Sequence, residues 1–319
     1  MLRTTGILTV AHAATPSPVS PWRRFVAIRE RTYRTAIGYA LLAPLALWIA
    51  LILVYPLINT IGLSLTNMRV VGSPSSFVGL DNYATVLASD DFWHGLLLSL
   101  LWLLGNSIVL TIVPFAVALF LRQPWRPARQ ARIWVLLPWV VPTVAVAVSW
   151  QWMLNSNYGV VNHLLEATGI ISAPLNVFGS ADLSLIGLIL TNSWHWFALP
   201  AVVIFGAMQT IPSDIYEAAK VDGATNTQTF RHITLPMIAK VLFALELVGN
   251  LWTFNVLDII FFITRGGPAD ATMTLPMELY YKAFKAWRMG EAAAMAVIVL
   301  ILLTIVCAVY VKRFRPRED

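Results

Sequence analysis

Six long apolar runs constrain this chain more than any other feature of its sequence. A helix needs about 20 apolar residues to cross the hydrocarbon core of a bilayer. Of the 319 residues, 58% are hydrophobic and only 12% are charged, which is too apolar for a single soluble core. We therefore predict an all-α polytopic membrane protein with six transmembrane helices. The predicted spans are residues 37–65, 96–121, 133–154, 183–208, 237–263 and 292–311.

The distribution of Lys and Arg predicts the orientation of these spans. Basic residues are retained on the cytoplasmic side of a membrane, whereas acidic residues have little influence. With the N-terminus inside, 17 of the 22 Lys and Arg residues lie in cytoplasmic segments, so both termini are expected in the cytoplasm. Residues 1–36 are then a partly disordered cytoplasmic lead, 37–312 the six-span domain and 313–319 a basic cytoplasmic tail.

A polar stretch between the fourth and fifth apolar runs has the pattern of a helical hairpin. Asp214 followed three residues later by Glu217 predicts a capped first helix. Thr225 followed by Gln228 predicts a capped second helix in the same way. Gly223 lies between them and is the residue type that ends a helix in the left-handed conformation. The predicted orientation places this hairpin in the cytoplasm.

The hairpin also carries a pattern that is similar to a known one. Residues 217–224 read EAAKVDGA, and residues 233–236 read ITLP. This pattern resembles the EAA loop of ABC importer permeases, in the form seen in the carbohydrate-uptake branch of maltose and glycerol-3-phosphate type. Similarity to this family of binding-protein-dependent inner-membrane components runs from about Tyr39 to Val311.

The resemblance implies a type I ABC importer permease fold in a bacterial cytoplasmic (inner) membrane, with residues 212–236 as the coupling loop. It implies that this loop contacts an ATPase through six residues: Glu217, Ala218, Ala219, Asp222, Gly223 and Ala224. Further partners implied by the family are a second, homologous permease subunit, two ATP-binding-cassette ATPase subunits and an extracytoplasmic solute-binding protein. The cargo would be a sugar, an oligosaccharide or a sugar or polyol derivative.

Catalytic and metal-binding patterns do not occur in the sequence. It contains no phosphate-binding GxxxxGK[ST] loop, so ATP and Mg²⁺ are expected on the partner ATPases and no cofactor on this chain. No Cys or His cluster has metal-ligand spacing, and no nucleophile has an evident base. The basic residues flank the predicted spans, which favours contact with membrane lipid over nucleic acid. We expect a transport subunit without catalytic activity.

Ionisable and amide side chains occur inside the fifth apolar run. Such groups are costly at membrane depth and are functional candidates for that reason. The helical spacing i, i+4, i+7 and i+11 predicts one face made of Glu246, Asn250, Thr253 and Leu257. Amide, hydroxyl and aromatic groups together suit a sugar, which needs hydrogen bonds and stacking. The candidate solute-pathway residues are Asn250, Trp252, Phe254, Asn255, Asp258, Glu246 and, in the fourth run, Trp194.

Alternative roles remain open for four of the charged residues. Glu217 either contacts the ATPase or only caps its helix. Glu246 and Asp258 either contact the solute or hold helices together through polar contacts. In a self-contained ion-coupled secondary carrier, the same two acids would bind the coupling ion, although the sequence lacks the paired broken helices of many carriers. Arg265 stands where the resembled family usually has a small or uncharged polar residue. It indicates either an anionic solute or a tolerated surface arginine.

Overall fold

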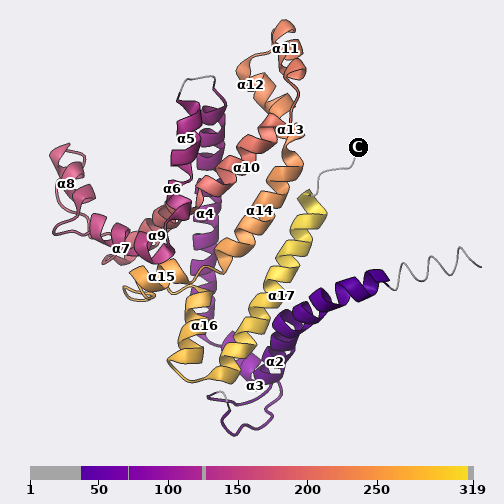
Figure 1. The fold of residues 1–319 in the computed structure, drawn as a ribbon. Coiled ribbons are helices and arrows are strands. Elements are labelled where there is room, and N and C mark those ends of the chain that lie inside the picture. Colours follow the sequence, from indigo (N-terminus) through magenta and orange to yellow (C-terminus); the bar gives the residue numbers. More distant parts are fainter. Residues whose placement is uncertain (1–36, 71, 124–126, 315–319) are drawn as a thin grey trace, which may run out of the picture. The chain divides into compact units, whose positions relative to one another are not determined.

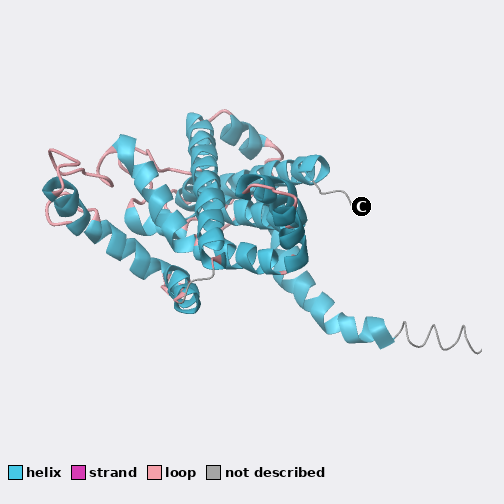
Figure 2. Cartoon of the chain, turned by 90° about the horizontal axis from the view of Figure 1, so that it is seen from above, coloured by secondary structure: helices cyan, strands magenta, loops and turns pink. Residues whose placement is uncertain are grey.

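The computed structural model describes residues 37–70, 72–123 and 127–314. Within these residues the ordered elements are helices joined by turns and loops (Figure 2). The β contact that they contain is an isolated bridge between Thr66 and Phe77. The predicted all-α class is therefore confirmed for the described chain, while the predicted lead at 1–36 lies outside it.

The chain divides into two compact units, Met1–Asn59 and Thr60–Asp319. In the first unit the described residues are helical and include the π-helical turn η1 (Ala50–Val54) and the start of α2 (Tyr55–Ser64). The apolar helix as a whole runs over Ile37–Ser64, which agrees with the first predicted span. Its most apolar window has no buried residue, as expected of a helix whose neighbours are lipid or another chain.

Three further helical segments are long and apolar enough to cross a membrane, and all belong to the second unit. They are α4 (Asp90–Arg122), the segment Ala239–Ile263 made of α14 (Ala239–Phe254) and α15 (Asp258–Ile263), and α17 (Met289–Phe314). Two bent helix pairs bring the number of possible spans to six. The other helices are α3 (Asp81–Leu87), α5 (Ala128–Val135), α6 (Leu137–Val140), α7 (Thr143–Met153), α8 (Val160–Ala167), α9 (Ala181–Trp196), α10 (Ala198–Gln209), α11 (Ser213–Val221), α12 (Asn226–Thr229), η2 (Phe230–Thr234), α13 (Leu235–Met237) and α16 (Leu275–Phe284).

The two bends follow from proline. The third predicted span bends by 93° between α6 and α7. Pro142 restricts the residue before it to extended backbone, and Val141 accordingly has a ψ of 130°. The fourth predicted span bends by 46° between α9 and α10, near Pro200, which has no backbone N–H to donate to the preceding turn.

The surface of α4 is inverted relative to a helix of a soluble protein. Its buried face includes the polar residues Ser99 and Asn106, whereas Leu104, Ile108 and Ile112 are each about three-fifths exposed. Apolar side chains on the outside and hydrogen-bonding side chains between helices are what a bilayer favours as solvent. The burial pattern of this helix therefore supports membrane insertion independently of its length.

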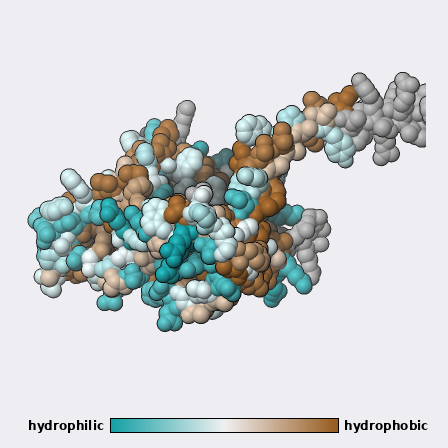
Figure 3. Space-filling view, turned by 90° about the horizontal axis from the view of Figure 1, so that it is seen from below, coloured by the Kyte–Doolittle hydropathy of each residue, from teal (hydrophilic) through white to brown (hydrophobic). Residues whose placement is uncertain are grey.

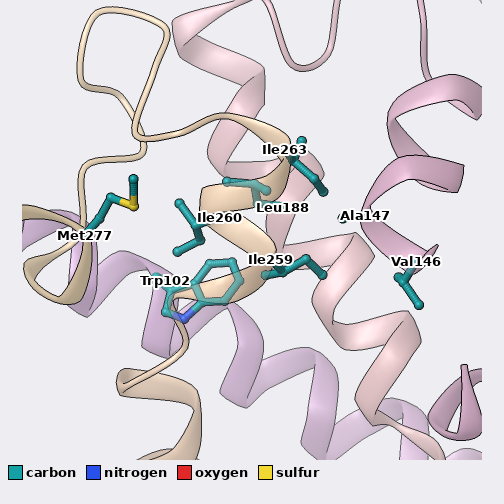
Figure 4. Close-up of a cluster of buried hydrophobic side chains, with 8 residues drawn as sticks. All are labelled: Trp102, Val146, Ala147, Leu188, Ile259, Ile260, Ile263 and Met277. Atoms are coloured by element: carbon teal, nitrogen blue, oxygen red, sulfur yellow. The ribbon is translucent and has the colours of Figure 1, made fainter. Parts of the chain in front are cut away.

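A cluster of buried apolar side chains joins the middle helices of the second unit (Figure 4). Trp102 of α4 belongs to this cluster and is completely buried. Its indole Nε1 donates a hydrogen bond of 2.8 Å to the carbonyl oxygen of Thr253, near the end of α14. Leu188 of α9 and Ile260 of α15 pack into the same cluster. These contacts fix the end of α14 against α4 and α9, which positions the cavity described below.

Candidate functional site

The hairpin at residues 212–236 (called the hairpin below) turns through a glycine-dependent helix cap. Gly223 has a φ of +75°, a value that residues with a Cβ rarely adopt. The backbone N–H of Gly223 bonds to the carbonyl of Lys220 at 3.2 Å, and that of Ala224 bonds to the carbonyl of Ala219 at 2.9 Å. These two bonds form the Schellman motif that closes α11. The predicted role of Gly223 as a helix end is confirmed.

Only the second of the two predicted capping boxes is present. Thr225 accepts from the backbone of Gln228, whose side chain bonds back to the backbone N–H of Thr225 at 2.8 Å. The predicted cap by Asp214 is wrong, because α11 already begins at Ser213, and its N-cap residue is Pro212 in an extended conformation. Asp214 lies in the first turn, where a negative charge still stabilises the helix through its dipole.

The predicted ATPase-contact residues differ in their exposure. Glu217, Ala218, Asp222 and Gly223 are exposed, Ala224 is half-buried and Ala219 is buried. Burial makes Ala219 a packing residue within the hairpin, so its part in any partner contact would be indirect. The sequence interpretation missed Val221, which is 88% exposed at the end of α11. An isolated apolar residue between Lys220 and Asp222 was the available signal.

The hairpin is attached to the membrane helices through aromatic contacts. The guanidinium carbon of Arg122, in the last turn of α4, lies 3.9 Å from the ring centroid of Tyr216 in α11. The Tyr216 hydroxyl is 3.1 Å from the hydroxyl oxygen of Thr234, which is buried. Phe115 of α4 and Phe230 of η2 pack edge to face with 5.6 Å between ring centroids. The predictions from sequence included none of these contacts.

A cavity of about 700 Å³ lies beside α9, α10 and α14. Its wall is mainly apolar, with a few polar or aromatic groups, which is the usual composition of a small-molecule site. Three predicted pathway residues, Trp252, Asn255 and Asp258, line it. The rings of Trp196 and Trp252, both in its wall, have centroids 6.1 Å apart. We refer to this space as the cavity.

The other predicted pathway residues lie elsewhere. Phe254 is 1% exposed and belongs to a separate apolar cluster that includes Phe92 and Met295. Trp194 packs edge to face on Trp150, with 5.6 Å between ring centroids, and is absent from the cavity wall. The single helical face expected to reach Leu257 is also interrupted, because α14 ends at Phe254 and the backbone turns before α15.

Glu246 and Asn250 line a smaller space of about 50 Å³ between α4, α10 and α14. The Thr111 hydroxyl of α4 lies 2.7 Å from Oε1 of Glu246, and Asn250 Nδ2 donates to Oε2 at 3.4 Å. The carboxyl group thus has partners on α4 and on its own helix, which supports the helix-joining role. Asp258 is exposed at the start of α15, where its Oδ1 accepts the backbone N–H of Ile259 at 2.9 Å.

Asn192 is the polar group of the cavity wall that sequence reasoning missed. Its Nδ2 donates to Oδ1 of Asn106 at 2.7 Å, and the same oxygen receives the Ser193 hydroxyl at 3.2 Å. Its own Oδ1 is buried and has no hydrogen-bond partner within the described chain. A buried carbonyl oxygen without a donor is costly, and this one is closed off from the cavity in the described arrangement. Three consecutive polar residues, 191–193, in an apolar run were the signal.

Residues 111–319 match the family described as "Binding-protein-dependent transport system inner membrane component". The chain belongs to this family. The match contains both the hairpin and the helices that border the cavity. The chain is therefore a multi-pass permease subunit of an ABC importer. Within its described residues no three His, Cys, Asp or Glu side chains are grouped to hold a metal ion.

Relatives extend this assignment along nearly the whole permease, and a solved structure shares its fold. It is 30% identical to the trehalose/maltose transport system permease protein MalF of Thermococcus litoralis, over 90% of this chain and 97% of that protein. It is 28% identical to the sulfoquinovosyl glycerol transport system permease protein SmoG of Agrobacterium fabrum, over 93% of this chain and 95% of that protein. A bacterial ABC transporter involved in the import of the acidic polysaccharide alginate has the same fold, with a TM-score of 0.77 at 22% identity over 92% of this chain and 100% of that one.

Proposed function

We propose that the permease moves a carbohydrate or carbohydrate derivative through the cavity. The wall of the cavity, where the rings of Trp196 and Trp252 lie with the exposed polar side chains of Asn255 and Asp258, carries this proposal. Sugars offer hydroxyl groups for such amide and carboxyl side chains and a C–H face for aromatic rings. Relatives named for transport of trehalose and maltose, of sulfoquinovosyl glycerol and of diacetylchitobiose support the same class of cargo.

The hairpin supports a second part of the proposal, contact with cytoplasmic ATPases. Its first helix presents Glu217, Ala218 and Val221 to solvent, and small residues allow another surface to approach closely. In this assembly ATP and Mg²⁺ are bound by the partner ATPases and the permease is not catalytic. A homologous permease completes the membrane pair, and a binding protein delivers solute from outside. Both termini of the permease lie in the cytoplasm, following the distribution of basic residues.

Transport in this proposal is a mechanical consequence of ATP binding and hydrolysis. Closure of the ATPases moves the two hairpins, and each hairpin pulls on α4 through Arg122 and on the fifth span through Thr234. The spans then exchange between inward-open and outward-open arrangements, whose populations shift with the state of the ATPases. The cavity is open to the cytoplasm in one arrangement and to the outside in the other.

The proposal also concerns the charge of the solute. Arg265 is exposed on the last external segment and forms no ion pair among the residues that the structure describes, whereas Lys282 is paired with Glu278 at 3.2 Å. An acidic cargo would use Arg265, while a neutral disaccharide would leave it free. Charge reversal in Arg265→Glu separates these cases, because it weakens transport of an anionic solute only.

The deciding experiment is ATP hydrolysis by the complete complex reconstituted with its binding protein. Neutral disaccharides, glycerol phosphate and acidic sugar derivatives are tested one class at a time. Stimulation by one class, together with uptake of that solute, supports the proposal and identifies the cargo. Uptake driven by a proton or sodium gradient without ATP would instead support the secondary carrier, for which the arrangement of Glu246 offers no support because its oxygens already have partners.

A further inference from the structure

The two ends of α4 lie at two different surfaces of the second unit. Near the start of α4, His94 Nε2 lies 3.2 Å from the carbonyl oxygen of Asp270, and near its end Arg122 stacks on Tyr216 of the hairpin. A helix of 33 residues spans about 50 Å at 1.5 Å per residue. The loops beside α3, α16 and the start of α17 therefore lie at the opposite end from the hairpin (Figure 1). Hydrophilic residues gather across this end (Figure 3).

A polar recess of about 640 Å³ occurs at this end of the second unit. Its wall combines residues 67–69, Asn82 of α3, and residues 286–291 at the start of α17, without residue 289. We call it the outer recess. Asn82 Nδ2 donates to the carbonyl oxygens of Ser64 and Thr66 at 2.8 Å each. The backbone N–H of Gly290 bonds to the carbonyl of Met68 at 2.9 Å, so three chain segments are tied together around the recess.

Close packing makes this wall rigid. A Cβ atom at Gly290 would overlap the carbonyl oxygen of Thr66, so the approach of α17 to this loop requires glycine. Trp287 has a φ of +55°, an uncommon value for a bulky residue that persists only where the surroundings fix it. The next residue, Arg288, donates its backbone N–H to the carbonyl of Lys282 at 2.9 Å and helps to hold this turn.

The outer recess presents residue types that dominate protein interfaces. Its wall holds the guanidinium groups of Arg69 and Arg288 and the indole of Trp287, which is 52% exposed. Tryptophan and arginine are enriched among the few residues that carry most of the binding energy in interfaces. Glu291 forms an ion pair with Arg288, with 3.6 Å between Oε2 and Nη1, and the buried Oε2 accepts no hydrogen bond within the described chain. The recess can thus donate to an anionic group through its two arginines.

We propose that the outer recess is a docking point for the binding protein, which inserts an acidic side chain between Arg69 and Arg288. Arginine forks match carboxylates in a bidentate geometry. The exposed indole of Trp287 packs against the surrounding surface of the binding protein. The inference rests on the proposed function, in which this end of the permease faces outward and meets a binding protein.

The test uses the complete complex in lipid nanodiscs and measures ATP hydrolysis against the concentration of solute-loaded binding protein. In the double variant Arg69→Glu, Arg288→Glu we expect the half-maximal concentration to rise at least tenfold at low salt. The rate without binding protein and the rate at saturation should stay unchanged. Lys285→Glu is the matched control, because Lys285 is exposed on the same turn but is absent from the recess wall. It should change the half-maximal concentration less than twofold.

Two further measurements keep the outcome decisive. Trp287→Asn should also weaken docking, and asparagine tolerates the left-handed backbone better than most residues. If the charge variants fail to assemble, Trp287→Cys in a Cys307→Ser background should crosslink to the binding protein, and absence of a crosslink would overturn the proposal. An unchanged half-maximal concentration would overturn it as well. So would an effect that follows the lipid headgroup composition of the nanodisc instead, since the recess would then bind lipid.

Failure of this inference and failure of the proposed function give different results. If the unmodified complex is stimulated by its binding protein and the double variant responds identically, only the docking point is wrong. If no binding protein and no solute stimulate the unmodified complex, the proposed function itself is wrong and the outer recess has no binding protein to receive.

Discussion

The guanidinium group of Arg122 stacks on the ring of Tyr216, with 3.9 Å between the guanidinium carbon and the ring centroid. This pair joins the last turn of α4 to the first helix of the hairpin. The hydroxyl of the same tyrosine lies 3.1 Å from Thr234 Oγ1, at the end of η2, shortly before the fifth span. One side chain therefore links the end of α4 to the part of the hairpin that leads into the fifth span, and movement of the first hairpin helix is transmitted to both.

We expect Tyr216→Ala to uncouple ATP hydrolysis from transport. The change removes a cation–π contact worth about 0.5–1 kcal/mol and a hydrogen bond worth about 1 kcal/mol. The variant should then hydrolyse several more ATP molecules per solute molecule transported than the unmodified complex does. Parallel measurements of uptake and phosphate release in proteoliposomes give this ratio. Tyr216→Phe keeps the ring and should show a smaller effect. An unchanged ratio of ATP to solute in Tyr216→Ala would contradict a transmitting role.

Gly223→Asp should abolish uptake while leaving membrane insertion intact. A residue with a Cβ pays roughly 1–2 kcal/mol in the left-handed conformation, and the added carboxylate lies at the C-terminus of α11, where the helix dipole disfavours negative charge. Open space around Gly223 means that no clash contributes. Gly223→Asn is the matched control, since it has the same shape without the charge and should retain part of the uptake. Normal uptake by Gly223→Asp, with normal protein in the membrane, would refute the prediction.

Asn192→Ala should weaken solute transport more than it weakens assembly. The change removes a hydrogen-bonding group from the cavity wall, and we expect a loss of about tenfold in solute-stimulated ATP hydrolysis, corresponding to about 1.4 kcal/mol. Because Asn192 also bonds to Asn106, the variant Asn106→Ala serves as a control that disturbs the network behind the wall. Equal losses in both variants would assign Asn192 to helix packing, and the cargo would have to be sought at another part of the cavity.

The sequence was sufficient for features that depend on composition and on local backbone rules. Length and hydrophobicity placed the spans, Gly223 placed the helix end, and Pro142 explains a bend that was predictable in principle. The direction of individual side chains was not predictable, because it depends on how helices rotate against one another. Phe254 was expected in the pathway but is buried against Phe92 and Met295, since α14 ends there and the chain turns.

Asn192 illustrates the same limit from the other direction. Its type and depth were visible in the sequence, but the unpartnered oxygen follows from Asn106, 86 residues earlier, taking up the Asn192 Nδ2 donor. The helices that carry these two residues are in contact through the cluster around Trp102. A contact between residues so far apart cannot be found from periodicity, which reports only the faces within one helix.

Replacement of Thr111 tests whether Glu246 joins helices or takes part in transport. Thr111→Val removes the hydroxyl that lies 2.7 Å from Glu246 Oε1 and should cost about 0.6 kcal/mol, the mean for polar contacts between membrane helices. We expect a slightly lower unfolding temperature of the purified permease and uptake that still depends on ATP alone. Glu246→Gln keeps hydrogen-bonding capacity without the charge and should be milder than Glu246→Leu in both measurements. If Glu246→Gln abolished uptake at full stability, or if uptake came to depend on an ion gradient, the carboxylate would have a direct part in moving the solute.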